Sequence, residues 1–97
     1  MPRVVTKPQS CRNIAGAATT VVKSGGGTLI GIVVNKAVAS GVVTVYDNTA
    51  ASGTKIATIT FPAVLLGNQV NLTYGCWFST GLTVVTSAAD DITVIYN

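Results

Sequence analysis

The sequence predicts an all-β fold, namely a single small antiparallel β-sandwich of the jelly-roll or Ig-like kind with seven to eight strands. Three observations support this prediction. Apolar and polar residues alternate with a period of two along most of the chain, and the alternating segments are rich in Val, Ile, Thr and Tyr. Turn-forming Gly, Ser, Asn and Asp residues separate these segments at intervals of roughly 8–12 residues. No long segment has the 3.6-residue period of a helix.

Seven segments are predicted as strands. In chain order they are residues 19–23, 28–36, 42–46, 55–61, 69–74, 82–86 and 92–96. The second segment is the longest and most apolar, and we expect Gly31 within it to mark a bulge or a close approach of another strand. Pro62 is expected to end the fourth segment and to protect a sheet edge. Residues 13–18 alone have the composition of a short helical turn, which Gly16 weakens.

A basic N-terminal arm at residues 1–13 is expected to precede one sandwich domain at residues 14–97. A chain of this length can bury one hydrophobic core. Arg3, Lys7 and Arg12 lie in the first twelve residues with no acid among them, whereas three lysines and three aspartates balance in the remainder. The net charge of +3 therefore belongs to the arm. We expect the arm to be extended, and either solvated or docked on a partner.

Residue types that carry out acid–base and metal chemistry are scarce. The chain has no His, and its only carboxylate side chains are those of Asp47, Asp90 and Asp91. General acid–base catalysis, catalytic triads and metal sites draw mainly on His, Asp, Glu and Cys. Cys11 and Cys76 have no His that could act as their base. We therefore expect a non-enzymatic protein that acts through its surfaces, with no catalytic residue, cofactor or metal.

Two features resemble ligand sites only superficially. Asp90 and Asp91 could hold Ca²⁺ with the help of backbone carbonyls, but such a site needs about six to eight oxygens, and a solvated turn is the favoured interpretation. The three glycines at residues 25–27 lack the Lys-Ser/Thr ending of a phosphate-binding loop. An apolar segment follows them in place of a helix, so we interpret the run as a connection between strands.

Nucleic acids and membranes are not expected partners. Three spaced basic residues without interleaved aromatic residues make a poor nucleic-acid site. No run approaches the roughly 18 apolar residues of a membrane helix. Residues 1–20 also lack the apolar stretch of a signal peptide, which predicts synthesis in a reducing cytoplasm. There Cys11 and Cys76 would remain thiols, although their spacing alone leaves a disulfide open.

The composition favours association with other chains. Only 9% of the residues are charged and 48% are hydrophobic, so a small domain of this kind leaves apolar surface to be covered by partners or by its own copies. Trp77 and Phe78 stand in a glycine-bounded segment, 75–81, which we expect to be a loop. Their rings could anchor an interface or form a carbohydrate platform. Alternatively, at least one of them closes an end of the core.

Four motifs follow one another in a characteristic order. They are TVYDNTAASG at residues 44–53, KIATI at 55–59, FSTGL at 78–82 and DITVIY at 91–96. Together with the glycine-rich turn before residue 28, they resemble small β-sandwich virion proteins of tailed bacteriophages, which decorate or cement capsids or ornament tails. The resemblance covers about four fifths of the chain, from residue 19 to residue 96.

The resemblance implies a structural protein of the virion, made in the bacterial host cytoplasm and without catalytic residues. Its closest counterpart would be a capsid decoration (cement) protein that binds the major capsid protein or another virion protein, often as a homo-trimer. We expect Arg3, Lys7 and Arg12 to contact an acidic partner surface, and the Thr-rich strands to self-associate. The alternative is an accessory module of a tail or head fibre that binds a host-surface glycan through Trp77 and Phe78.

Overall fold

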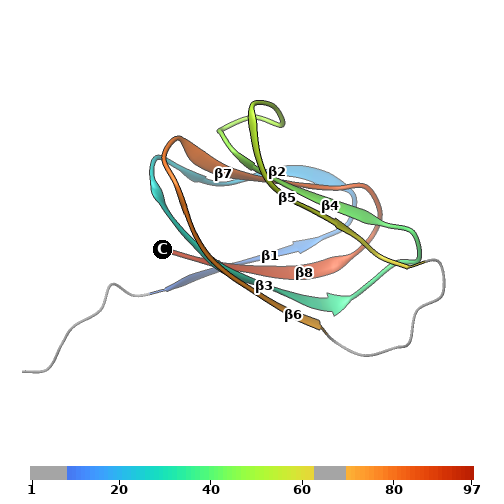
Figure 1. The fold of residues 1–97 in the computed structure, drawn as a ribbon. Coiled ribbons are helices and arrows are strands. Elements are labelled where there is room, and N and C mark those ends of the chain that lie inside the picture. The colour runs from blue at the N-terminus through green and yellow to red at the C-terminus, as the bar shows by residue number, and fades with distance from the viewer. Residues whose placement is uncertain (1–8, 63–69) are drawn as a thin grey trace, which may run out of the picture.

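The computed structural model describes residues 9–62 and 70–97, and it confirms the all-β prediction. The described chain forms eight antiparallel strands and no helix (Figure 1). The strands are β1 (Ser10–Ala15), β2 (Ala18–Ser24), β3 (Gly27–Lys36), β4 (Val42–Asp47), β5 (Thr54–Thr60), β6 (Val70–Phe78), β7 (Gly81–Thr86) and β8 (Asp91–Tyr96).

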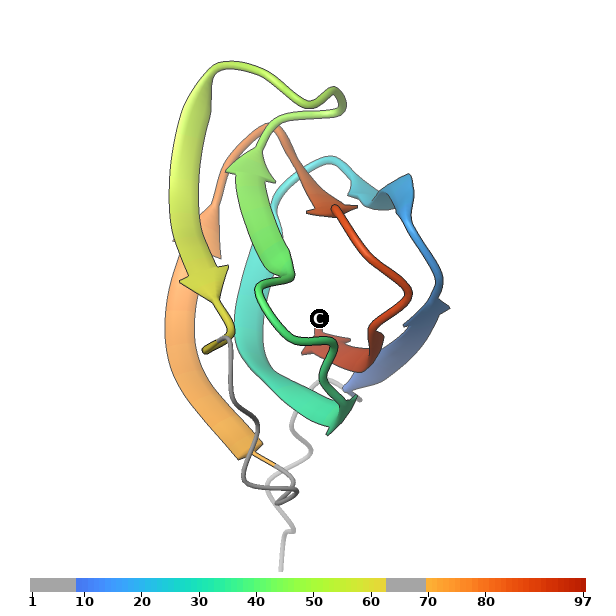
Figure 2. The same cartoon turned by 90° about the vertical axis from the view of Figure 1, so that its right-hand side faces the viewer.

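The strands form two stacked four-stranded sheets, with the orders β1-β8-β3-β6 and β2-β7-β4-β5 (Figure 1). The first strand pairs with the eighth, the second with the seventh, the third with the sixth and the fourth with the fifth. This nested pairing arises when one long antiparallel ribbon rolls into two sheets, and it distinguishes a jelly roll from an Ig-like sandwich. Figure 2 shows β5 and β6 along one side of the sandwich and β1 and β2 along the other.

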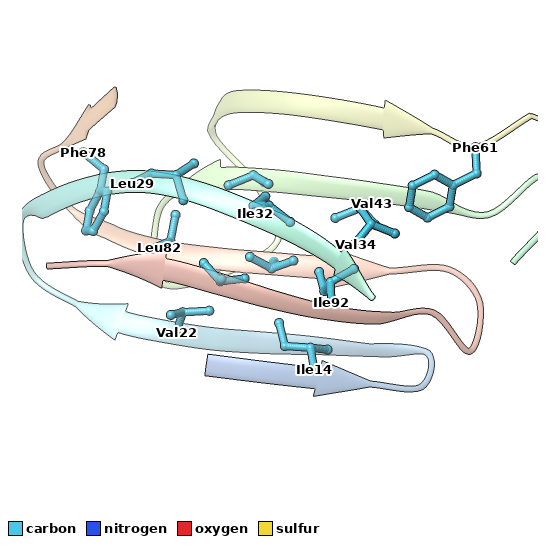
Figure 3. Packing of buried hydrophobic residues seen from close by; sticks show 13 residues of the cluster. Ile14, Val22, Leu29, Ile32, Val34, Val43, Phe61, Phe78, Leu82 and Ile92 are labelled. Carbon is cyan, nitrogen blue, oxygen red and sulfur yellow. The ribbon is translucent and has the colours of Figure 1, made fainter. Parts of the chain in front are cut away.

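The inward faces of the two sheets share one hydrophobic core. Alternation along each strand directs one set of side chains inward, and most of the buried ones are Val, Ile and Leu. Phe78 lies at one end of this core and Phe61 at the other (Figure 3). Burial of an aliphatic or Phe side chain contributes about 1.5–3 kcal/mol relative to leaving it in water. The thirteen buried hydrophobic residues among the described ones therefore provide the main stabilisation of the sandwich.

The prediction for Gly31 is confirmed in both of its forms. The pairing of β3 shifts register between Leu29 and Gly31 on both sides, toward β8 and toward β6. A Cβ atom at Gly31 would lie 2.7 Å from the backbone oxygen of Leu72. On the β6 side, the shift falls next to Gly75, whose φ of 86° is open to glycine and strained for other residues.

The prediction of a short helical turn at residues 13–18 is wrong. Asn13 and Ile14 belong to β1, where they pair with Thr93 and Ile92 of β8. Only Ile14 of this strand is buried, so β1 is held by pairing more than by core packing. Residues 10–13 of the expected arm therefore lie in the sheet, and residues 1–8 lie outside the described residues.

Candidate functional site

The outer face of the β1-β8-β3-β6 sheet presents a surface with few charged residues, which we call the Trp77 face. Its residues alternate with buried neighbours in each strand and so point away from the core. Among the described residues of this face, the charged ones are Asp91 and its register partner Lys36, which lie together at one end. The face consists of Cys11, Asn13 and Ala15 of β1; Asp91, Thr93 and Ile95 of β8; Thr28, Ile30, Val33, Asn35 and Lys36 of β3; and Asn71, Thr73, Gly75 and Trp77 of β6.

The loop that we expected around Trp77 and Phe78 is not observed. Both residues belong to a strand, because β6 continues through Phe78. Strand alternation sends the two adjacent rings to opposite sides of the sheet. Phe78 is completely buried in the core, whereas Trp77 is 71% exposed. Phe78 therefore has a packing role, and of these two aromatic side chains only Trp77 is accessible to a partner.

A row of neutral polar groups extends from Trp77 across the sheet. Thr28 of β3 pairs with Trp77. Thr28 in turn exchanges two backbone hydrogen bonds with Asn97, both of 3.0 Å. Asn97 follows Tyr96, which packs against the core, so its side chain belongs to the outer side. An indole, a hydroxyl and an amide thus share this end of the Trp77 face, a combination suited to stacking and to uncharged hydrogen bonding.

The middle of the Trp77 face is apolar. Ile30 and Val33 of β3 and Ile95 of β8 are half-buried there, without a partner layer above them in the described structure. Thr73 of β6 pairs with Gly31 beside them and adds a single hydroxyl. This aliphatic strip separates the aromatic end of the face from a polar end.

The polar end is a hydrogen-bonded network across β1, β8 and β3. Asp91 Oδ1 accepts hydrogen bonds from the side-chain amides of Asn13, at 2.7 Å, and Asn35, at 3.1 Å. The same two amides donate to Thr93 Oγ1 at 3.4 Å and 3.0 Å. The hydrogen bond from Asn13, and then that from Asn35, lowers the pKa of the Asp91 carboxyl below its ordinary value. This network fixes the side chains of three strands in one arrangement.

Asp90 is buried, which contradicts the expected solvated turn. Its Oδ1 accepts a hydrogen bond of 2.8 Å from the backbone N–H of Val38, and so ties the β7–β8 connection to the β3–β4 connection. Its Oδ2 has no hydrogen-bond partner among the described residues. Asp90 and Asp91 thus project to different sides of the chain and do not form the two-carboxylate Ca²⁺ site considered from the sequence.

Asp47 has a structural role that the sequence did not reveal. Its carboxylate, at the end of β4, accepts hydrogen bonds from the backbone N–H groups of Ser79, at 3.1 Å, and Thr80, at 2.9 Å. The bonds from Thr80 and then Ser79 lower the pKa of Asp47. The carboxylate therefore caps the turn between β6 and β7, directly after Phe78. The sequence signal for this cap was an Asp at the end of a predicted strand. It did not identify the hydrogen-bond donors, because they lie more than thirty residues away in the sequence.

Arg12, the one predicted basic contact residue that the structure describes, lies apart from the aromatic residues. Arg12 is exposed on β1, at one edge of the sheet, while Trp77 and Phe78 belong to β6 at the other edge. Arg3 and Lys7 lie outside the described residues. The two kinds of predicted contact residue therefore mark two separate edges of the same sheet.

Both cysteines are free thiols, as predicted. Cys11 is on β1 and Cys76 is on β6, so two strands lie between them. With neighbouring strands about 4.8 Å apart, three strand spacings amount to roughly 14 Å. A disulfide requires Cα atoms within about 7 Å, so this pair cannot be bridged in the folded sheet.

Metal ligands do not cluster in the described structure. Residues 9–62 and 70–97 contain no group of three or more His, Cys, Asp and Glu side chains placed to hold a metal ion. This part of the chain also contains no helix able to span a membrane. Comparison with protein-family models, with curated proteins and with solved structures finds no match to this chain. The Trp77 face and the two edges of its sheet are thus the surfaces on which a functional interpretation rests.

Proposed function

We propose that this chain is a non-enzymatic structural protein of a tailed-phage virion, and specifically a capsid decoration protein that attaches to the assembled shell. The observation that carries the proposal is the Trp77 face, a sheet surface whose charged residues, Asp91 and Lys36, pair at one end and whose other end carries an exposed indole. Such a surface suits docking on another protein, because aromatic residues are favoured and charges are disfavoured at interface centres. The jelly-roll topology is compatible, since capsid domains use it repeatedly.

Stabilisation of the shell would follow from mass action. A protein that binds the assembled shell, and not its separated subunits, lowers the free energy of the closed state by an amount that increases with its free concentration relative to its Kd. No chemical step is needed. The resemblance to phage decoration proteins adds self-association, and the virion as the location, to the proposal.

The basic residues are proposed to contact an acidic surface of the capsid. Arg12 projects from the exposed edge strand β1, and Arg3 and Lys7 precede it in the sequence. Charged contacts at the margin of an interface mainly affect the rate and the salt dependence of association. We therefore assign these residues to capture of the protein, and the Trp77 face to its retention.

Co-sedimentation with mature capsids that lack this protein tests the proposal. Binding in a fixed, saturable ratio, together with a higher bursting temperature of the capsids, is the expected result. Deletion of residues 1–8 leaves β1 intact and should weaken attachment at moderate salt. Arg12→Gln should do the same, whereas the matched control Lys55→Gln, on edge strand β5 of the other sheet, should not. Capsids that neither bind the chain nor gain heat resistance would exclude a cement role.

A second candidate function is supported by the row formed by Trp77, Thr28 and Asn97. An exposed ring beside neutral hydroxyl and amide groups is suited to a sugar, which offers an apolar face and hydroxyl groups. The protein would then be an accessory module of a tail or head fibre that binds a host-surface glycan. In that case Trp77→Ala should abolish binding to host cells or to their purified surface polysaccharide, while the heat resistance of the particles stays the same.

A further inference from the structure

The four edge strands of the sandwich differ in how they are protected against pairing with other chains. Edges are commonly protected by charged side chains, because a charge opposes the approach of a further strand. β1 carries Arg12, β2 carries Lys23 and β5 carries Lys55. β6 is also an edge strand, nine residues long, and it contains no charged residue.

β6 also carries most of the exposed large apolar surface of the described chain. Among the described residues, three large hydrophobic side chains are strongly exposed, namely Val21, Val70 and Trp77. Val21 lies on β2, whereas Val70 and Trp77 lie near the two ends of β6. An unprotected edge and exposed apolar side chains thus coincide on one strand.

Within the described structure, the backbone of β6 is available for pairing along its outer side. β3 pairs with β6 on one side, and no described strand pairs with it on the other. From Val70 to Thr73 the pairing with β3 is regular, and it is regular again from Cys76 to Phe78, with the bulge at Gly75 between these stretches. The free edge therefore consists of two regular halves joined at the centre.

We propose that two copies of this chain associate through antiparallel pairing of their β6 strands about a two-fold axis. Full overlap of two nine-residue strands places the axis at Tyr74, the middle residue of β6. The regular first half of each strand then faces the regular second half of the other, and the two bulges meet at the axis. In this register Trp77 of one copy faces Asn71 of the other on the outer side of the joined sheet.

A second copy is the occupant that the charge distribution favours. If two copies paired through β1, β2 or β5, each copy would bring a basic side chain to an edge that has no acidic side chain. Pairing through β6 brings no charged side chain to the edge. Each indole is 71% exposed before pairing, and contact with Asn71 of the other copy covers only part of it. The strand contacts must supply the rest of the approximately 1,200 Å² of a small specific interface. The bulge increases the local twist, so we expect a dimer that dissociates on dilution.

The single tryptophan of the chain makes this proposal directly testable, whether or not the protein attaches to a capsid. Sedimentation velocity over a series of concentrations should show the mass rising from 9.9 kDa toward twice that value. The fluorescence emission of Trp77 should shift to shorter wavelength over the same range, because the indole leaves water. Trp77→Ala should move the dimerisation to higher concentration.

A pair of matched variants locates the interface. Thr73→Lys places a charge on the β6 edge and should abolish both the mass increase and the emission shift. Thr58→Lys makes the same change at an exposed position of edge strand β5, which Lys55 already protects, and should change neither. Thermal unfolding establishes that each variant is folded, and Asn71→Lys replaces Thr73→Lys in case the latter is not.

Three results would overturn the proposal. They are a monomer at every concentration, a trimer such as the phage resemblance implies, and an equal effect of the β5 and β6 substitutions. A dimer that fails to bind capsids would leave β6 pairing supported and would count against the decoration role alone.

Discussion

Trp77 and Phe78 are consecutive residues of β6 that lie on opposite sides of the sheet, one 71% exposed and the other fully buried. The strand thus presents the indole ring of Trp77 to solvent and the phenyl ring of Phe78 to the core. The turn that follows is capped by Asp47 through the N–H groups of Ser79 and Thr80. The buried ring and the cap together fix the end of β6, so the indole is held on a rigid element.

Replacement of the two rings should therefore have opposite consequences for stability and binding. Phe78→Ala leaves a large cavity at the end of the core and should cost about 3–5 kcal/mol of unfolding free energy. Trp77→Ala should change it by about 0.5 kcal/mol or less, because the side chain is mostly in water. Urea denaturation of both variants measures the difference. A similar loss for both would contradict the assignment of the rings.

Gly31→Ala should destabilise the pairing of β3 with β6. A Cβ atom there would lie 2.7 Å from the backbone oxygen of Leu72, so the strands must move apart. We expect a loss of about 1–3 kcal/mol, as for overpacking in general. Gly26→Ala is the control, since its nearest backbone contact would be at 3.3 Å, and it should cost less. Equal stabilities of the two variants would show that the sheet accommodates the methyl group.

Removal of the Asp90 side chain should separate the two connections that it joins. Asp90→Ala leaves the N–H of Val38 without its acceptor, which costs about 1–3 kcal/mol for a buried group. Asp90→Asn keeps an acceptor oxygen and should lose clearly less. The midpoint of thermal unfolding compares the two variants. If the asparagine variant were the less stable one, the negative charge and not the hydrogen bond would be the important property of this residue.

Acid should destabilise the fold through Asp47 and Asp91. Hydrogen bonds to both carboxylates lower their pKa in the native state below the ordinary value of 3.8. The unfolded chain therefore takes up these protons at higher pH than the native state does. The stabilisation is present at neutral pH and is expected to decrease below about pH 5, as the pH falls toward the native pKa values. Urea midpoints measured from neutral to acidic pH follow this loss.

The variant Asp47→Asn/Asp91→Asn tests the origin of that acid sensitivity. It should be less stable than the original chain at neutral pH, since both carboxylates accept several hydrogen bonds. Its stability should depend much less on pH in the acidic range. An unchanged acid dependence would assign the effect to other groups.

Much of the fold could be predicted because most strands have a local sequence pattern, in which apolar residues alternate with polar ones between turn-forming residues. The seven predicted segments all overlap strands of the structure, and the bulge at Gly31 was recognisable from a glycine inside an apolar run. β1 was missed because only Ile14 of its residues is buried, so it lacks the apolar alternation of a core strand. The choice between a jelly roll and an Ig-like sandwich depends on long-range pairing, which no local pattern encodes.

The candidate site could be predicted only in part. The importance of the segment around Trp77 was visible from its aromatic residues, but the loop expected there is the end of a strand. Which ring is buried depends on the phase of β6 relative to the core, and that phase is set by pairing with the distant strand β3. The burial of Asp90 could not be anticipated either, because its partner Val38 is brought to it by the packing of two distant connections.

The central position of β8 has a consequence for synthesis of the protein. β8 lies between β1 and β3, so β1 has no partner in its sheet until residues 91–96 have left the ribosome. Folding that depends on such distant contacts is slow, and it leaves nascent strands open to association meanwhile. On a polysome, neighbouring nascent chains would each carry an emerging β6 without a charged residue. Efficient production would then depend on chaperones or on widely spaced ribosomes to keep these strands apart until each chain closes its own sheet.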